Sequence, residues 1–121
     1  MTNLDIRTPR RGEIYWLNWN PARGSEQAGR RSALIIQENA GSANPNYPLT
    51  IVAAVSTNGR AIVTHVEVGR SELNGLEQLS YVKCEQVQTV SKQRLVHRIG
   101  ELEPEHMARV DDALRKVFAL A

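Results

Sequence analysis

The chain has 121 residues, a mass of 13.5 kDa and a formal net charge of +2, which fits one domain with its own core. Its single cysteine, Cys84, excludes a disulfide framework and a zinc site built from several cysteines. The apolar runs are too short to span a bilayer and the first residues lack the core of a secretory signal, so we expect a cytoplasmic protein. Twelve of the 15 basic residues are arginines, whose planar donor fork matches phosphate, and this is a first indication of phosphate contacts.

The first part of the chain predicts an arm, a strand and a long loop. Residues 1–10 are polar and predict a flexible arm, which leaves 11–121 as a single domain. The segment from Glu13 to Trp19 is rich in aromatic and β-branched residues and predicts a half-buried strand. Residues 20–30 are full of turn formers and charge, and a loop of this length in a small domain is usually functional.

The middle of the chain predicts further short strands. Two apolar runs are too short for helices and are bounded by turn residues, which favours buried strands, and the later segments alternate with a period of two. The predicted strands cover 33–36, 51–55, 64–68, 81–90 and 96–99, with a loop over 39–48.

The last part of the chain changes to a helical period. Ser91 is a suitable cap for one helical turn ending at Leu95. Pro104 suits the first turn of a helix, which we expect to run from about 104 to about 119. Its apolar face comprises Met107, Val110, Leu114, Val117 and Phe118. Short strands followed by one helix predict a mainly β fold, a small and strongly curved sheet or barrel capped by that helix.

Several kinds of site find no support in the sequence. No glycine-rich loop joins a strand to a helix, so neither a dinucleotide site nor a P-loop is predicted. The histidines His65, His97 and His106 fall on separate elements without metal-ligand spacing. We expect a structural or solvated role for each of them, and a packing role for Cys84. No metal or other cofactor is predicted.

The segment from Arg23 to Arg31 contains the richest group of candidate functional side chains in the sequence. It places three guanidiniums, a carboxylate, an amide and two glycines in one loop that ends where a buried strand begins. This arrangement is typical of a phosphate-binding loop that is anchored to a rigid strand. A solvated loop that only keeps the protein soluble has the same composition, and spacing alone leaves both interpretations open.

A family resemblance favours the first interpretation. The segments that carry it are 11–16, 20–21, 23–27, 31–37, 51–56, 64–68, 85–90 and 92–95. Together, over residues 10 to 120, they resemble the MazF/PemK toxin family, which cleaves mRNA at selected sequences and belongs to toxin–antitoxin pairs. The resemblance implies a small SH3-like β-barrel with a C-terminal helix, a homodimer, a metal-independent endoribonuclease and a MazE-like antitoxin that covers the RNA groove.

The family's catalytic positions fall on two residues of this chain. Its catalytic arginine matches Arg31, and the catalytic threonine that ends its third strand matches Ser56. Ser32 stands where the family usually has proline, which leaves the backbone after Arg31 less fixed. Ser56 keeps a hydroxyl but lacks the methyl group that stiffens its rotamer. Thr57 takes the role of Ser56 only if the strand register shifts.

The resemblance also implies the reaction. The 2′-OH of single-stranded mRNA attacks the adjacent phosphodiester and leaves a 2′,3′-cyclic phosphate and a 5′-OH. For this reaction we hypothesise that Arg31 stabilises the developing charge and delivers a proton to the leaving oxygen, and that Ser56 hydrogen-bonds a phosphate oxygen. Glu26 is the candidate general base because it shares the loop. Trp16 and Trp19 are expected in the core or the dimer interface more often than stacked on bases. The candidate RNA-binding residues are Arg23, Gly24, Ser25, Gln27, Arg30, Thr57, Glu85 and Gln86.

Two other functions compete with the endoribonuclease. The same barrel fold includes CcdB-like toxins that inhibit a DNA gyrase without cutting RNA, and the retention of Arg31 and of the Ser56 hydroxyl argues against such a binding module. An SH3-like domain that recognises proline-rich peptides needs an exposed aromatic groove. The chain has only six aromatic residues, which argues against that function too.

Overall fold

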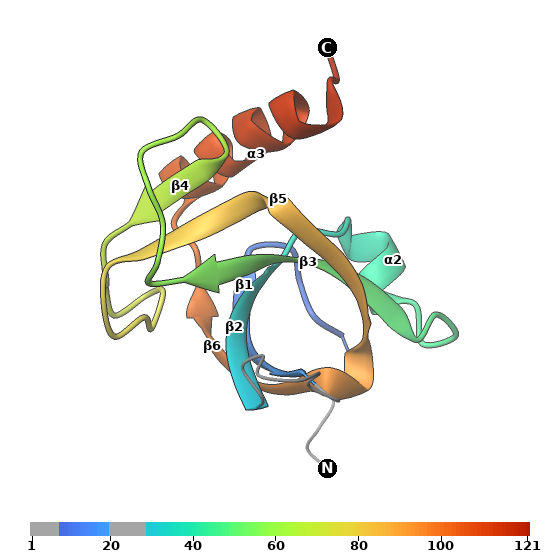
Figure 1. Cartoon of the computed structure of the whole chain (residues 1–121). Helices are drawn as coiled ribbons and strands as arrows, with labels where there is room; N and C mark the ends of the chain where they lie inside the picture. Colours follow the sequence, from blue (N-terminus) through green and yellow to red (C-terminus); the bar gives the residue numbers. More distant parts are fainter. Residues whose placement is uncertain (1–7, 20–28) are drawn as a thin grey trace.

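The computed structural model describes residues 8–19 and 29–121 (Figure 1). Within these residues, six strands form one antiparallel sheet in the order β4-β5-β3-β2-β1-β6. The sheet curls into a barrel-like form with a long helix lying against it (Figure 1). In chain order the elements are β1 (Glu13–Trp19), β2 (Gly29–Ile35), α2 (Asn39–Ala43), β3 (Leu49–Ser56), β4 (His65–Val68), β5 (Ser80–Ser91), the 3-10 turn η1 (Lys92–Arg94), β6 (Leu95–Glu101) and α3 (Pro104–Phe118).

A strand is present at each of the six predicted places, and the predicted turn after Ser91 is η1, whose first free amide is capped by the Ser91 hydroxyl. The predicted loop over 20–30 is wrong at its end, because β2 already begins at Gly29. Gly29 and Arg30 pair with Trp19 and Asn18 of β1, so they belong to the strand although their neighbours in the sequence favour turns. The loop predicted over 39–48 contains the short helix α2, whose five residues are too few to show a helical period.

Alternation along the strands divides the apolar side chains between two cores. On β1, Ile14 belongs to the outer core, which lies between the sheet and α3, while Tyr15 belongs to the inner core. The inner core contains no residue of α3, so it fills the inside of the curled sheet. Its members are Tyr15, Leu17, Ala33, Ile35, Val52, Val90 and Leu95.

Helix α3 begins at Pro104, as predicted, and ends where Ala119 adopts a left-handed conformation with φ of 58°. Val110 is fully buried in the outer core. Phe118 was expected on the apolar face, but it is 52% exposed at the C-terminal end of the helix. The prediction of a mainly β fold with a C-terminal helix is confirmed. In the described part of the chain, no helix has the length and apolar character needed to cross a membrane.

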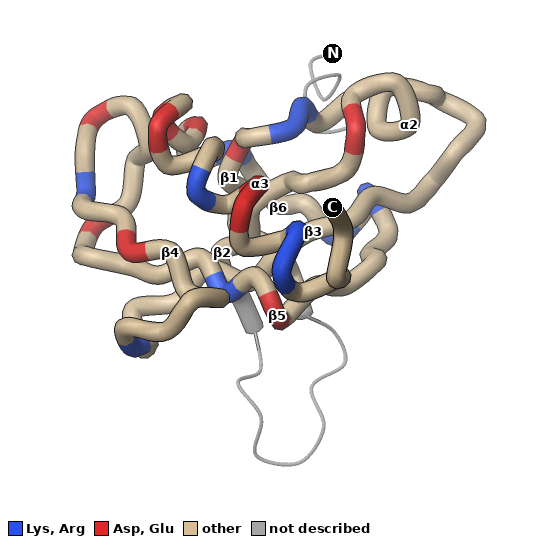
Figure 2. Tube along the Cα trace, turned by 90° about the horizontal axis from the view of Figure 1, so that it is seen from above, with Lys and Arg blue, Asp and Glu red and all other residues tan. Residues whose placement is uncertain are grey.

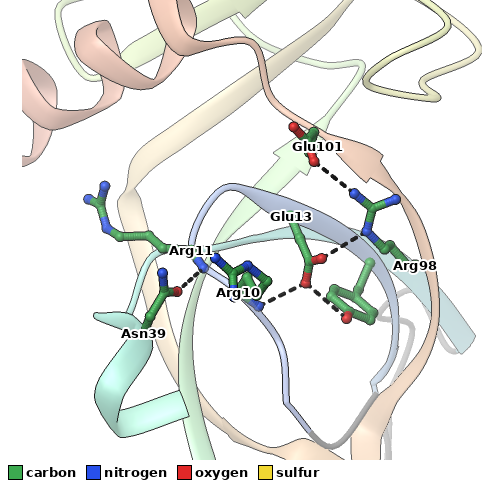
Figure 3. A network of polar contacts seen from close by, with 7 residues as sticks. Arg10, Arg11, Glu13, Asn39, Arg98 and Glu101 are labelled. Atoms are coloured by element: carbon green, nitrogen blue, oxygen red, sulfur yellow. Dashed lines mark hydrogen bonds and ion pairs between the residues drawn. The ribbon is translucent and has the colours of Figure 1, made fainter. Parts of the chain in front are cut away.

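A polar network fixes β1 to the edge strand β6 (Figure 3). The Glu13 carboxylate accepts hydrogen bonds from the Arg10 amide at 2.8 Å, the Tyr15 hydroxyl at 3.1 Å and Arg98 Nε at 2.9 Å. Arg98 also donates to Glu101 at 2.9 Å. The bond between Glu13 and Arg98 joins the two strands, and the bonds from Arg10 and Tyr15 hold the Glu13 carboxylate in the position that it needs.

Candidate active site

Arg31 and Ser56, the two candidate catalytic residues, line one pocket with a volume of about 390 Å³. Arg31 lies on β2, and Ser56 is the last residue of β3. Because Ser32 pairs with Val55 in the antiparallel ladder, Arg31 and Ser56 lie one step further along the same two strands. Strand pairing therefore brings a guanidinium and a hydroxyl to one pocket.

Both serines that differ from the family pattern are oriented by hydrogen bonds. Ser32 Oγ donates to the Val55 carbonyl at 3.0 Å, so this side chain ties β2 to β3 beside Arg31. That bond restrains the backbone at the position where the family has a proline ring. Ser56 Oγ accepts a hydrogen bond from the Asn58 amide at 3.0 Å, which fixes the hydroxyl without the methyl group of threonine.

Trp16 and Lys83 also line this pocket, and neither was predicted as a site residue. Trp16, expected in the core or an interface, is only partly buried and lines the pocket. Lys83 on β5 also lines it and adds a second cation. The alternation of Tyr81 and Lys83 with the buried Val82 and Cys84 is the sequence signal that places Lys83 on the face opposite the outer core.

A second pocket, with a volume of about 540 Å³, adjoins the first. The two pockets share Thr57, Asn58, Lys83 and Gln86, so together they form a continuous groove across the ends of β3 and β5. Thr57 and Gln86, both candidate RNA-binding residues, therefore lie at the junction. The remaining lining residues of the second pocket are Gly59, Arg60, Ile62, His65, Leu79, Tyr81 and Glu85.

An irregularity in β5 presents Glu85 and Gln86 to this groove. Ala53 pairs with Val87 and the next residue, Ala54, pairs with Lys83, so the residues between Lys83 and Val87 have no partner on β3. Such a bulge interrupts the alternation of side chains and turns some of them in a new direction. Glu85 and Gln86 are consequently both exposed, although they are neighbours in a strand.

His65 on β4 is joined to Glu85 across the sheet. Its Nε2 lies 2.9 Å from Glu85 Oε2, and its Nδ1 accepts a hydrogen bond from the Arg60 amide at 3.2 Å. Because Nδ1 is the acceptor, the neutral ring carries its proton on Nε2 and donates it to the carboxylate. Burial alone would raise the pKa of Glu85, but hydrogen bonds from His65, its own backbone and Thr64 outweigh burial and hold that pKa below its usual value.

Cys84 takes no part in the groove. Its side chain is fully buried in the outer core, as the sequence predicted. Burial, followed by the charges of Glu85 and Asp111, raises the pKa of its thiol to about 11. The thiol is therefore protonated at neutral pH and is a poor nucleophile.

Several candidate residues of the loop lie outside the described residues. These are Arg23, Gly24, Ser25, Glu26 and Gln27. Arg30 belongs to β2 through its backbone, which pairs with Asn18. The structure thus brings together Arg31, Ser56, Thr57 and Gln86 in the first pocket and adds Glu85 in the second.

Basic residues do not gather over one large face of the described chain, and the positive charge at the groove comes from a few side chains. Figure 2 shows basic and acidic positions interspersed along the described chain. Arg31, Lys83 and Arg60 line the groove, and Glu85 is the only carboxylate among its described lining residues. In the same described ranges, no three His, Cys, Asp or Glu side chains come close enough together to hold a metal ion.

Comparison with known proteins identifies the family. Residues 10–118 match the model of the PemK-like, MazF-like toxin of type II toxin–antitoxin systems. The chain belongs to this family. Endoribonuclease EndoA from Bacillus subtilis is 39% identical over 113 residues, which cover 92% of this chain and 95% of that protein.

Solved MazF-like structures share the fold. An endoribonuclease in complex with its cognate antitoxin, from a mycobacterial species, is 26% identical with a TM-score of 0.76, and the match covers 93% of this chain and 97% of that one. The Mycobacterium tuberculosis toxin MazF-mt6 is also 26% identical, with a TM-score of 0.73 over 90% of this chain and 98% of that one. These matches confirm the predicted barrel-like fold class of the MazF/PemK family.

Proposed function

We propose that this chain is the toxin of a type II toxin–antitoxin system and a metal-independent endoribonuclease that cleaves single-stranded mRNA at selected sequences. The observation that carries the proposal is the shared pocket of Arg31 and Ser56 in a chain of the MazF-like family. The 39% identity to an endoribonuclease over most of both chains supports the activity.

The reaction uses the substrate's own nucleophile. The 2′-oxygen attacks the adjacent phosphorus, the bond to the 5′-oxygen breaks, and the products are a 2′,3′-cyclic phosphate and a 5′-OH. Negative charge grows on the phosphorane oxygens, and the guanidinium of Arg31 stabilises it and delivers a proton to the leaving oxygen. The Ser56 hydroxyl donates a hydrogen bond to a non-bridging oxygen, and Lys83 adds positive charge at the same pocket.

We assign the general base that removes the 2′-OH proton to the segment from Arg23 to Arg31. The guanidinium of Arg31 is already protonated before the reaction, so it can give a proton to the leaving oxygen but is a poor base toward the 2′-OH. Glu85 has a lowered pKa and accepts a hydrogen bond from His65, which also makes it a weak base at neutral pH. Glu26 therefore remains the candidate, together with RNA contacts from Arg23, Gly24, Ser25, Gln27 and Arg30.

The proposal includes a partner, an oligomeric state and a compartment. A mycobacterial relative was solved with its cognate antitoxin, and we propose a MazE-like antitoxin that covers the groove of this chain. A homodimer is proposed from the family, and the cytoplasm is proposed because it holds the mRNA substrate.

The test is cleavage of a mixed pool of single-stranded RNA in EDTA, with sequencing of the 5′ ends and detection of cyclic phosphate. We expect cleavage by the wild-type chain and a loss of about 100-fold or more in Arg31→Ala, the scale expected when a charge-stabilising group is removed. Arg109→Ala, which removes an exposed arginine on α3, is the matched control and is expected to cleave normally.

Two results would contradict the proposal. If the wild-type chain cuts no RNA in the pool, a gyrase-inhibiting toxin of the same fold becomes the better assignment. If Arg31→Ala cuts as fast as the wild type, the chemistry lies elsewhere in the molecule.

A further inference from the structure

The second pocket is placed to hold the part of the substrate next to the reacting phosphate. It shares Thr57, Asn58, Lys83 and Gln86 with the pocket of Arg31 and Ser56. A nucleotide whose phosphate lies in the first pocket can therefore reach the second with its sugar and base. A volume of about 540 Å³ lies within the range of pockets that bind small ligands, so a nucleobase fits.

The walls of this pocket are held in place by contacts within the chain. The Arg60 amide donates to His65 Nδ1, which ties the segment between β3 and β4 to the sheet. Gly59 in the same segment lies so close to Tyr81 that a Cβ there would be 2.2 Å from its ring. The Tyr81 and His65 rings lie 6.3 Å apart between centroids. These contacts make the pocket a preformed one.

One charged acceptor in the pocket has a fixed orientation. The Glu85 side chain is 39% exposed, so a ligand can reach it, whereas the His65 side chain is only 6% exposed. His65 Nε2 donates to Glu85 Oε2, and Thr64 and the Glu85 backbone donate further hydrogen bonds to this carboxylate. An ionised carboxylate has about four lone-pair sites, so acceptor capacity is left for a ligand. Because the pKa of Glu85 lies below its usual value, the carboxylate stays ionised and only accepts hydrogen bonds.

We propose that this second pocket binds the base beside the cleaved phosphate, and that Glu85, positioned by His65, selects bases with an exocyclic amino group over uracil. The inference rests on the proposed function and names the base preference of the same site. Adenine, cytosine and guanine each present an amino group to an acceptor, while uracil presents carbonyl oxygens on both sides of its single N–H. A carboxylate facing those oxygens is repelled.

The experiment is a cleavage profile on an RNA pool with randomised sequence, read as the base frequency at each position around the cut. For the wild type we expect uridine to be depleted about tenfold at one position next to the cut, the scale of a specific contact to a base edge. Glu85→Gln introduces an amide donor that suits the uracil carbonyls, so the depletion is expected to disappear. Glu67→Gln, on the same face of β4 as His65 but outside the pocket, is the matched control and keeps the depletion.

Two variants test whether His65 acts through Glu85. His65→Phe keeps an aromatic ring but removes both hydrogen bonds, so uridine depletion is expected to be lost as in Glu85→Gln. His65→Gln keeps an amide donor for Glu85 and is expected to restore the depletion. A purely structural role of His65 would change the rate of cleavage without changing the base preference. Thermal unfolding of each variant shows that it is folded.

Three outcomes would overturn the inference. The first is a wild-type profile in which uridine is as frequent as the other bases around the cut. The second is a Glu85→Gln profile equal to that of the wild type. The third is a folded Glu85→Gln protein that cuts no RNA, which would place Glu85 in the chemistry instead of base selection. Absence of cleavage by the wild type would instead overturn the proposed function, and this inference with it.

Discussion

The hydroxyl of Ser56 is held by a hydrogen bond that leaves its proton available to a ligand. A hydroxyl has one proton to donate and two lone pairs to accept with. Ser56 Oγ accepts from the Asn58 amide at 3.0 Å, so one lone pair is used and the proton is left for a ligand oxygen. The same bond limits the rotation of a side chain that lacks the methyl group of threonine.

Removal of the Ser56 hydroxyl is expected to slow cleavage by about 100-fold, the lower end of the range for a lost donor to a charged intermediate. Ser56→Thr keeps the hydroxyl and adds the methyl group, so it is expected to cleave at least as fast as the wild type. Single-turnover cleavage of one RNA by Ser56→Ala and Ser56→Thr measures both effects. A Ser56→Ala variant with wild-type rates would remove Ser56 from the mechanism.

At the scale of elements, one carboxylate joins the segment between β4 and β5 to the start of α3. Glu103, which precedes α3, accepts hydrogen bonds from Ser71 Oγ at 2.6 Å and from Asn74 Nδ2 at 3.2 Å. Asn74 is fully buried, and its amide also donates to the Gly69 carbonyl at 2.9 Å. The segment therefore closes over the edge of the outer core through polar bonds that depend on an ionised carboxylate.

Stability is expected to depend on pH through Glu103. Burial would raise its pKa, but hydrogen bonds from Ser71, its own backbone and Asn74, with the charge of His106, lower it. A lowered pKa in the folded state contributes stability that is complete above the ordinary value of 4.5 and is lost as the pH falls through the lowered one.

Glu103→Gln is expected to reduce the free energy of unfolding by about 1–2 kcal/mol at pH 7, because hydrogen bonds to a charged group are lost. The difference from the wild type should shrink in acid, since the wild-type carboxylate is then protonated as well. Urea unfolding at pH 7 and below pH 4 checks this. Glu105→Gln, an exposed change in the first turn of α3, serves as the control. A difference that stays constant with pH would contradict the role of Glu103.

The parts of the site that depend on which strands are neighbours in the sheet could not be predicted from the sequence. Residue type, short apolar runs and period-two alternation located the strands. The family pattern led to Arg31 and Ser56, which pairing of β2 with β3 brings to one pocket. The place of Lys83 beside them depends on β5 pairing with both β3 and β4, which no local pattern reveals. The bulge after Lys83 likewise has no sequence signature, so the meeting of Glu85 with His65 was not predicted.

For the whole molecule, the distribution of charge bears on how RNA is held. The net charge is only +2, and Lys83 is the one described residue that brings a positive charge to both pockets. No described acidic side chain forms an ion pair with it. A cation without such a partner is free to neutralise a phosphate and to release its counterion, which makes its contribution measurable by salt.

Lys83→Gln is expected to weaken the binding of RNA of every sequence and to reduce the slope of log K against log salt by about 0.7, the value for one phosphate of a single strand. The measurement uses 2′-O-methyl RNA of random sequence, which lacks the attacking hydroxyl and so binds without being cut. Lys116→Gln removes an exposed lysine of α3, away from both pockets, and should leave the slope unchanged. Equal slopes for Lys83→Gln and the wild type would mean that Lys83 contacts no phosphate, and the positive charge of the groove would then come from its arginines.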